Sequence, residues 1–331
     1  MITKTMKSRV ALFGTAVLTV FALASCAGTA AEPGGADAPN DGTLEVVDLK
    51  VGIVPVVDMA GIFRAIDGGY FKDEGLNVTV QPAASGGTLG TALLSGDLQA
   101  SSSTWPSWFL ATSNAAPLRF VGMGVSGTED TAGVYSAPES GITKPADLEG
   151  KTVAVNSLKN SGELTIRAVL EGEGVDSSAV SFTELPFPDM IGAVTQGSVD
   201  AVWVVEPFTT AAINAGLSRV LSSYSGPAKD IPVSGMAMLD SFVKKNPNTA
   251  AAFARALERG NADLAADPAL AREILLKEPF NQAPAVVETM SLPAWTAGFP
   301  SEDKLEIWNE LMMKFDLLSS PVDLKSVTFA P

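Results

Sequence analysis

The sequence lacks histidine altogether and holds a single cysteine among its 331 residues. Without histidine the chain has no Ser-His-Asp triad, no Cys-His pair and no histidine-ligated zinc or haem. One cysteine excludes an internal disulfide and a thiolate metal cluster. We therefore expect no bound metal and no cofactor.

Positive charge is also scarce, with 22 Lys and Arg against 37 Asp and Glu and a formal net charge of −15. Nucleic-acid binding requires clustered Lys and Arg, so a nucleic acid is excluded as the main partner. Because 46% of the residues are hydrophobic and only 18% charged, the chain has enough apolar side chains for a substantial core. Its length indicates about two domains.

Residues 1–25 are predicted to be a signal peptide. Basic residues precede an apolar run over residues 10–24, which is too short for a comfortable membrane span. The run ends in Leu-Ala-Ser-Cys at residues 23–26, which resembles a bacterial lipobox. Cys26 is then the residue that receives the lipid anchor. The alternative is a buried cysteine in an ordinary signal peptide or a transmembrane helix.

Residues 26–43 contain small and polar residues and are predicted to be a flexible tether. The folded body then begins near Leu44. Cleavage before Cys26 removes Lys4, Lys7 and Arg9 and no acidic residue, which takes the formal net charge from −15 to −18. We expect this acidic body to lie outside the membrane.

Apolar strand-like runs alternate with helical patterns along the body. In its first part, the strand-like runs are residues 46–54, 76–80, 98–102 and 118–125. The order then restarts, with strand-like runs at residues 152–155, 180–185, 201–205 and 220–221. Residues after 240 are mostly helical in pattern. Alternation of this kind predicts an α/β fold with mainly parallel sheets flanked by helices, here in two lobes of similar size.

Five sequence motifs occur in a fixed order along these two units. They are Gly-Tyr-Phe-Lys-Asp-Glu-Gly-Leu-Asn-Val at 69–78, Ser-Gly-Gly at 85–87, Leu-Ser-Gly-Asp at 94–97, Asp-Leu-Glu-Gly-Lys-Thr-Val-Ala-Val at 147–155, and Gly-Ser-Val-Asp-Ala at 197–201 with Glu-Pro-Phe at 206–208. In this order the chain resembles the solute-binding proteins of ABC importers for sulfonates, taurine, nitrate and thiamine-pyrimidine precursors. The resemblance covers about residues 47–266.

The resemblance implies a two-lobed periplasmic-binding-protein fold, type II-like, whose chain crosses twice between the lobes at the hinge. We place the crossings near residues 125–134 and 231–238. The first lobe is then 44–127 plus 238–331, and the second is 128–237. The family also implies a membrane permease with a cytoplasmic ATPase as partner, and we expect a monomer.

Ligands of open parallel sheets bind beyond the carboxyl ends of the strands. In the first lobe this places Asp58 after one strand and Ser85, Gly86, Gly87 and Thr88 after the next. The glycines allow a close approach of the backbone, and the N–H groups of the following helix point outward. The alternative for this turn is a plain helix cap without a ligand.

Thr104 and Trp105 follow the third strand. A hydroxyl beside an aromatic ring suits a ligand with one polar and one flat face. Trp105 fits the hydrophobic core equally well.

In the second lobe, Asn160 and Ser161 begin a helix after a strand, with Ser161 as the expected N-cap. Trp203 and Glu206 lie at the end of another strand, and the resemblance implies that Glu206 either contacts the ligand or holds the loop. Trp203 alternates with valines, so it suits the core as well as the ligand wall.

This set of loops holds the carboxylates of Asp58 and Glu206, and Lys159 is its only cation. A strongly anionic ligand ordinarily calls for Arg or Lys. We therefore expect a small organic solute that carries hydrogen-bond donors, either an amino-sulfonate such as taurine or a nitrogen heterocycle such as a pyrimidine precursor.

Three functions remain open from the sequence. The first is a lipoprotein that delivers a solute to an ABC importer. The second is a ligand-sensing subunit for a membrane receptor. The third is an enzyme on the same fold, but its relatives depend on His and Cys, and no carboxylate pair stands out here. We expect no enzyme.

Overall fold

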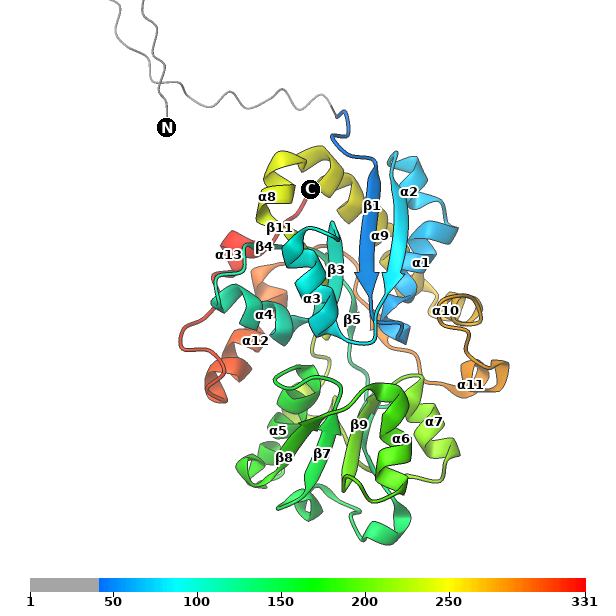
Figure 1. The fold of residues 1–331 in the computed structure, drawn as a ribbon, viewed down its shortest axis with the longest axis vertical. Coiled ribbons are helices and arrows are strands. Elements are labelled where there is room, and N and C mark those ends of the chain that lie inside the picture. Colours follow the sequence, from blue (N-terminus) through cyan, green and yellow to red (C-terminus); the bar gives the residue numbers. More distant parts are fainter. Residues whose placement is uncertain (1–41) are drawn as a thin grey trace, which may run out of the picture. The chain divides into compact units, whose positions relative to one another are not determined.

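The computed structural model describes residues 42–331, and these form two lobes around two five-stranded sheets (Figure 1). Cys26, the predicted signal peptide and nearly all of the predicted tether lie outside the described residues. Among the helices of residues 42–331, none combines the length and the hydropathy that a membrane span requires. The α/β class, the two lobes and the helices on both sheets agree with the expectation from sequence.

The sheet of the first lobe has the strand order β2-β1-β3-β11-β4. Its strands are β1 (Asp48–Ile53), β2 (Asn77–Pro82), β3 (Ala100–Thr104), β4 (Leu118–Met123) and β11 (Ser234–Leu239). β1 pairs in parallel with β2 and β3, whereas β11 runs antiparallel to β3 and β4. Its flanking helices are η1 (Val57–Met59), α1 (Ala60–Asp67), α2 (Tyr70–Asp73), α3 (Gly86–Ser95), α4 (Trp105–Ser113), α8 (Asp240–Lys245) and α9 (Pro247–Ala266).

The C-terminal part of the chain adds four helices and one short strand. They are α10 (Leu270–Leu275), α11 (Pro284–Thr289), β12 (Ala294–Trp295), α12 (Glu302–Lys314) and α13 (Leu324–Val327). Close packing of α9 on α1 requires a glycine, because a Cβ at Gly260 would lie 2.4 Å from the Gly61 carbonyl oxygen. The small residues of the Ala-rich helix thus bring it directly against α1.

The sheet of the second lobe has the strand order β10-β6-β9-β7-β8. Its strands are β6 (Ala132–Ser136), β7 (Thr152–Val155), β8 (Ser181–Glu184), β9 (Ala201–Val205) and β10 (Ser218–Ser222). Around it lie α5 (Ser161–Gly172), α6 (Phe187–Thr195), α7 (Phe208–Asn214) and the short helices η2 (Pro138–Ser140), η3 (Pro145–Leu148), η4 (Ser177–Ala179) and η5 (Gly226–Ala228). β6 is antiparallel to β9 and β10, while β7 pairs in parallel with β8 and β9.

β6 and β11 are the two long strands that the sequence pattern did not reveal. Each follows a crossing between the lobes and runs antiparallel to its neighbours. All five residues of β6 are buried, and so are the first five of β11, which removes the alternation that marks a half-buried strand. The expected lobe boundary between residues 237 and 238 falls inside β11. Both strands that pair with β11 belong to the first sheet, so the whole of β11 belongs to the first lobe.

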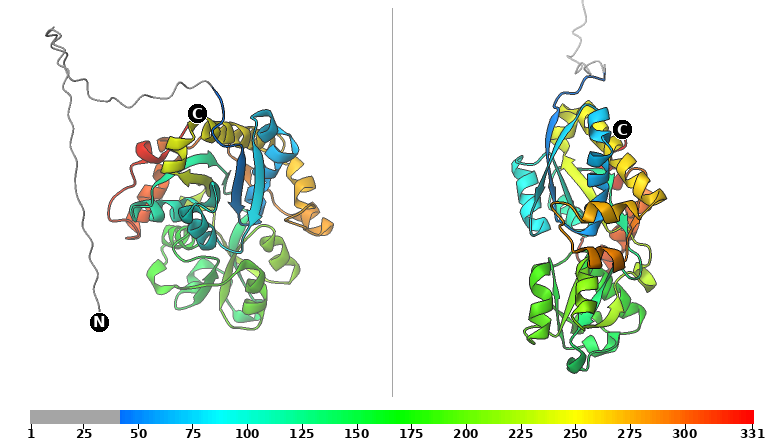
Figure 2. Two further views of the ribbon diagram at one scale, coloured as in Figure 1. Left: turned by 45° about the horizontal axis from the view of Figure 1, so that its top comes forward. Right: turned by 90° about the vertical axis from the view of Figure 1, so that its right-hand side faces the viewer.

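The two crossings lie side by side at the hinge, between the two lobes that the right-hand view of Figure 2 shows one above the other. The first passes through β5 (Val125–Ser126), which pairs with β12, and Ser126 also forms a bridge with Pro232 of the second. Tyr224 of the second crossing packs on Gly127 of the first, where a Cβ would lie 2.2 Å from the ring. Three segments distant in sequence therefore meet at the hinge.

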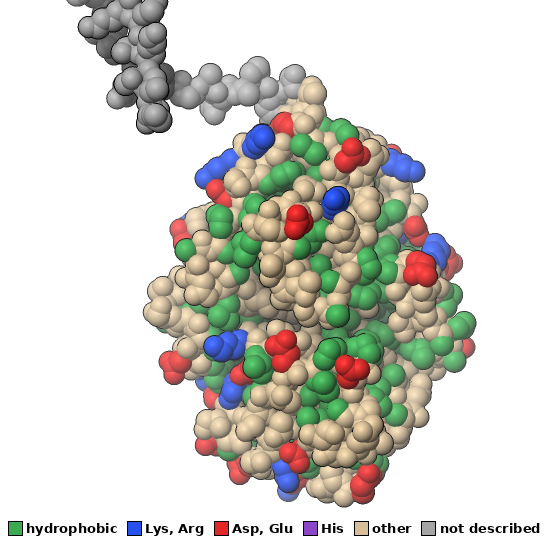
Figure 3. Space-filling view, viewed as in Figure 1, with side chains coloured by type: hydrophobic (Ala, Val, Ile, Leu, Met, Phe, Trp, Pro, Cys, Tyr) green, Lys and Arg blue, Asp and Glu red, His purple; other side chains and the backbone are tan. Residues whose placement is uncertain are grey.

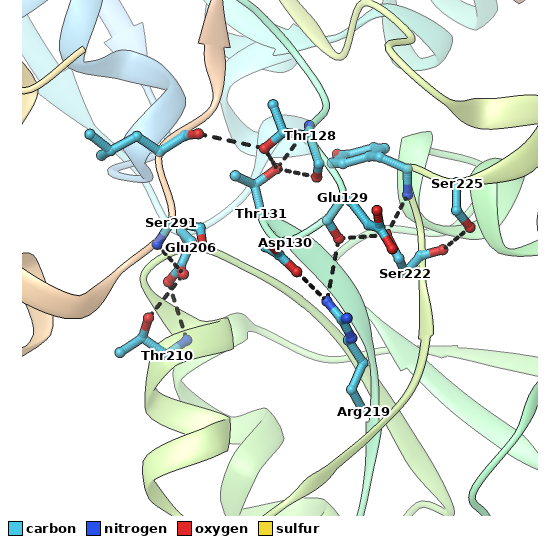
Figure 4. A network of polar contacts seen from close by, with 12 residues as sticks. Thr128, Glu129, Asp130, Thr131, Glu206, Thr210, Arg219, Ser222, Ser225 and Ser291 are labelled. Atoms are coloured by element: carbon cyan, nitrogen blue, oxygen red, sulfur yellow. Dashed lines mark hydrogen bonds and ion pairs between the residues drawn. The ribbon is translucent and has the colours of Figure 1, made fainter.

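Polar contacts fix the second lobe to this hinge (Figure 4). The Glu206 amide donates to the Thr131 carbonyl over 3.0 Å. Arg219 donates to Asp130 over 2.7 Å, and the Ser222 hydroxyl donates to the Glu129 carbonyl over 2.6 Å. The start of the second lobe is thus bonded to two of its own strands directly after the crossing.

Candidate ligand-binding cleft

A cavity of about 450 Å³ opens between the lobes, with walls from both. Figure 3 shows a hollow at mid-height of the molecule, with hydrophobic side chains gathered to its right. The first lobe lines the cavity after β1 and β3 and at the start of α3, and the second lobe lines it after β7, at Phe187 and at the end of β9. The cavity therefore lies at the carboxyl ends of parallel strands in both sheets, as expected from sequence.

Of the residues expected to bind ligand, those that line the cavity are Asp58, Gly86, Gly87, Thr104, Asn160, Ser161 and Trp203. Between them stand further hydroxyl groups, including those of Ser102, Ser103 and Ser107. Apolar side chains such as Val54 and Met59 complete the walls. A mainly apolar cavity with a few convergent polar groups is the usual form of a small-molecule site.

Asp58 is the carboxylate of the cleft. It lies in η1 directly after β1, and it accepts a hydrogen bond of 3.1 Å from the Ser234 hydroxyl. Burial raises the pKa of Asp58 to about 6, while the hydrogen bond from Ser234 acts in the opposite direction. Among the described residues Asp58 has no ion-pair partner, so a donor on the ligand is the natural complement to its charge.

The start of α5 presents the second polar group of the cleft. Asn160 is the N-cap, and its side chain accepts from the amides of Gly162 and Glu163. The prediction that Ser161 is the cap is therefore wrong by one residue. The Ser161 hydroxyl is buried and has no hydrogen-bond partner within residues 42–331, and Ser161 is among the residues that line the cavity.

The start of α3 contributes to the cavity from the first lobe. Ser85 is the N-cap, and its hydroxyl accepts from the Thr88 amide over 3.4 Å. Gly86 and Gly87 come next and line the cavity, while Ser85 and Thr88 do not. A Cβ at Gly86 would lie 3.0 Å from the Ser103 hydroxyl oxygen, so a glycine suits this close approach.

Lys159 is the cation that lines the cavity. Its backbone is left-handed, with φ 58°, and its amide donates to the Glu163 carboxylate over 2.8 Å. The ammonium group forms no ion pair with any described residue. Among the residues that line the cleft, Asp58 of the first lobe is thus the one acidic residue and Lys159 of the second lobe the one basic residue.

Trp105 and Glu206 lie away from the cavity. Trp105 is 0% exposed and packs edge-on against Phe120, so of the two positions expected for it the structure supports the core. The Glu206 carboxylate is 2% exposed and accepts hydrogen bonds from the amide and the hydroxyl of Thr210 and from the Ser291 amide. These bonds tie α7 to the C-terminal segment, as Figure 4 shows, so Glu206 holds its loop.

Two further aromatic residues line the cleft besides Trp203. Trp108 lines it from α4, and its ring N–H donates to the Gly235 carbonyl over 3.2 Å. Phe187 lines it from the start of α6. Trp108 lies three residues after Trp105, which places both on the same side of a helix, so helical spacing alone does not separate the cleft residue from the core residue. Within residues 42–331, no three acidic, His or Cys side chains gather to hold a metal.

The sequence profile of the family described as NMT1/THI5 like matches residues 56–271, which span both lobes and the cleft. The chain belongs to this family. The motifs at 69–78 and 206–208 fall within the matched region, as do Asp58 and Ser161 of the cleft.

Two relatives of the NMT1/THI5-like chain bind different solutes. The taurine-binding periplasmic protein of Escherichia coli K12 is 25% identical over 78% of this chain and 76% of its own length. The riboflavin-binding protein RibY of Chloroflexus aurantiacus is 24% identical over 97% of this chain and 96% of its own length. The relatives are thus solute-binding proteins, with an amino-sulfonate in one case and a flavin in the other.

A solved structure supports the fold. The alkanesulfonate-binding protein SsuA of Xanthomonas axonopodis pv. citri, bound to MOPS, superposes with a TM-score of 0.73 at 17% identity. The match covers 87% of this chain and 100% of that one. The two-lobed fold is therefore that of periplasmic binding proteins.

Proposed function

We propose that this protein is an extracytoplasmic solute-binding protein that captures a small organic solute between its lobes. It delivers the solute to an ABC permease with a cytoplasmic ATPase. The observation that carries the proposal is the cavity of about 450 Å³ lined by strand ends and helix starts of both lobes. Membership of the NMT1/THI5-like family and the solute-binding relatives support it.

The polar groups of the cleft favour a solute with both donors and acceptors. An amine or ring N–H complements Asp58, which is half-buried and lacks a cation among the described residues. An acceptor such as a sulfonate, carboxylate or carbonyl oxygen complements the Ser161 hydroxyl and the backbone at Gly86 and Gly87. An amino-sulfonate meets both requirements, and so does a nitrogen heterocycle with ring carbonyl groups.

We further propose that the protein binds without turnover, as a monomer anchored by a lipid on Cys26. The missing histidine, and the fact that Asp58 is the one carboxylate among the residues lining the cleft, favour binding over acid-base catalysis. The Leu-Ala-Ser-Cys sequence at 23–26 supports the anchor.

A thermal-shift screen tests the binding proposal directly, because a ligand that binds only the folded state raises the unfolding midpoint. The panel contains taurine, alkanesulfonates, pyrimidines, riboflavin and nitrate. We expect at least one organic member to raise the midpoint and to be recovered unchanged after incubation, as checked by mass spectrometry. Conversion of the bound compound would contradict binding without turnover.

The anchor is tested separately with the full chain in a bacterial host. Wild-type protein should incorporate a labelled fatty acid, and Cys26→Ala protein should not. Equal labelling of the two proteins would rule out Cys26 as the lipid-bearing residue.

A further inference from the structure

A second cavity of about 270 Å³ lies beside the cleft and is lined only by apolar residues. We call it the apolar groove, and its lining consists of residues 54–56 and 82–84 of the first lobe and residues 186–188 with Phe208 of the second. It shares Val54, Val56 and Phe187 with the cleft. The groove therefore adjoins the cleft along both lobes.

Hydrogen-bond donors are scarce along the groove. Its four prolines, at positions 55, 82, 186 and 188, lack a backbone N–H. The amides of Val56 and Ala83 donate to the carbonyls of Val54 and Ile53, so they are already used. None of the lining side chains is charged or polar. The groove therefore favours an apolar occupant, since its lining offers a polar group few partners to replace bonds to water.

Aromatic rings form a continuous wall from the cleft into the groove. Phe208 stacks on Phe187 with ring centroids 5.3 Å apart, and the centroids of Phe187 and Trp203 are 5.8 Å apart. Trp203 lines the cleft, Phe208 lines the groove and Phe187 lines both. The Trp203 ring is held in place, because its N–H donates to the Ser223 hydroxyl over 2.7 Å.

We propose, on the basis of the proposed function, that the solute is elongated and carries an aromatic ring. Its polar head binds among the hydroxyl groups, Asp58 and the helix starts of the cleft, and its ring lies in the apolar groove against Phe187 and Phe208. The space is sufficient, because an engineered apolar cavity of about 150 Å³ binds benzene and the groove has about 270 Å³. Taurine, which has no apolar extension, leaves this groove empty.

Matched probe pairs test the groove with two different head groups. One pair is ethanesulfonate and 2-phenylethanesulfonate, and the other is ethylamine and 2-phenylethylamine. Within each pair only the phenyl ring differs. Calorimetry should find the phenyl member of at least one pair bound about ten- to a hundredfold more tightly, since burial of a phenyl ring is worth that factor.

An Ala84→Trp variant fills the groove from its exposed rim, and Ala266→Trp adds the same side chain at an exposed site at the end of α9. We expect Ala84→Trp to abolish the advantage of the phenyl member and Ala266→Trp to retain it. Equal affinities within both pairs, or an advantage of the phenyl member that persists in Ala84→Trp, would contradict the proposal that the groove binds the ring. The proposal that the protein binds a solute would stand. Failure of every probe and every member of the thermal-shift panel to bind would overturn the proposed function and this inference together.

Discussion

The Ser234 hydroxyl donates a hydrogen bond of 3.1 Å to the Asp58 carboxylate, and the two residues are 176 positions apart in the chain. Asp58 follows the first strand of the first lobe, and Ser234 begins the strand that returns from the second lobe. Their contact fixes the one carboxylate of the cleft at the point where the second crossing ends. The acidic group of the site is thus coupled to the hinge.

Stability should depend on pH through Asp58. Burial raises its pKa to about 6 from the ordinary 3.8, so the folded state binds more protons than the unfolded state between these values. The contribution of Asp58 to stability therefore declines as pH rises from 4 to 6. We expect the free energy of unfolding of wild type, relative to Asp58→Asn, to fall by about 1–2 kcal/mol between pH 4 and pH 7.

Urea unfolding of both proteins at several pH values measures this difference. A constant difference across the range would show that Asp58 titrates normally. In the same proteins, a solute that donates to the carboxylate should bind wild type more weakly below pH 6 and should lose affinity in Asp58→Asn at pH 7.

Removal of the Ser161 hydroxyl should affect binding and not folding. This hydroxyl is buried without a partner in residues 42–331, so Ser161→Ala removes no bond within the described protein. We expect unchanged or slightly higher stability, and affinity for an anionic or carbonyl-bearing solute reduced by about 1–3 kcal/mol.

Thr165→Val is the matched control on the same helix, because the Thr165 hydroxyl donates to the Ser161 carbonyl and does not line the cleft. Calorimetry with the solute from the thermal-shift screen should separate the two variants. Equal affinity of Ser161→Ala and wild type would remove Ser161 from the site.

Trp105 and Trp203 should respond differently to truncation. Trp105→Ala empties a fully buried position next to Phe120, so we expect a loss of about 3–5 kcal/mol of stability. Trp203→Leu removes a ring of the cleft wall and should lower the affinity for the solute in protein that remains folded. Denaturant midpoints and calorimetry measure the two effects, and an unchanged midpoint in Trp105→Ala would contradict its place in the core.

Glu206 should act on stability through its hydrogen bonds to Thr210 and Ser291. In Glu206→Gln, an NH₂ group replaces one acceptor oxygen and is placed opposite other donors. We therefore expect the free energy of unfolding to fall by about 1–3 kcal/mol. Glu288→Gln is the control, since Glu288 is exposed on the neighbouring α11. A denaturant midpoint of Glu206→Gln equal to that of the control would show that these three bonds add nothing to stability.

Much of the fold could be predicted because local pattern and tertiary structure agree. The strands of residues 152–155 and 201–205 and the long helix that ends at Ala266 appear where the apolar pattern placed them. β6 and β11 escaped prediction because burial on both faces removes alternation. The signal for an antiparallel strand after each crossing lies in its partner strands and not in its own sequence.

For the site, the sequence located the loops, since ligand sites of parallel sheets lie at strand ends. It did not separate Trp105 from Trp108, because both lie on one short helix and the direction of each side chain depends on how α4 packs against β3 and β11. Glu206 and Asp58 were equal candidates in the sequence. One carboxylate is held by Thr210 and Ser291, and the other faces the cleft.

The sequence alone determined the fold class, the order of the motifs and the kinds of chemistry that the chain lacks, because composition and local periodicity carry that information. The tertiary structure decided which side chains face the cavity and placed an apolar groove beside it. Those features depend on contacts between residues far apart in the chain, such as Asp58 with Ser234 and Glu206 with Ser291. No local pattern encodes such contacts, since they form only when folding brings these distant segments of the chain together.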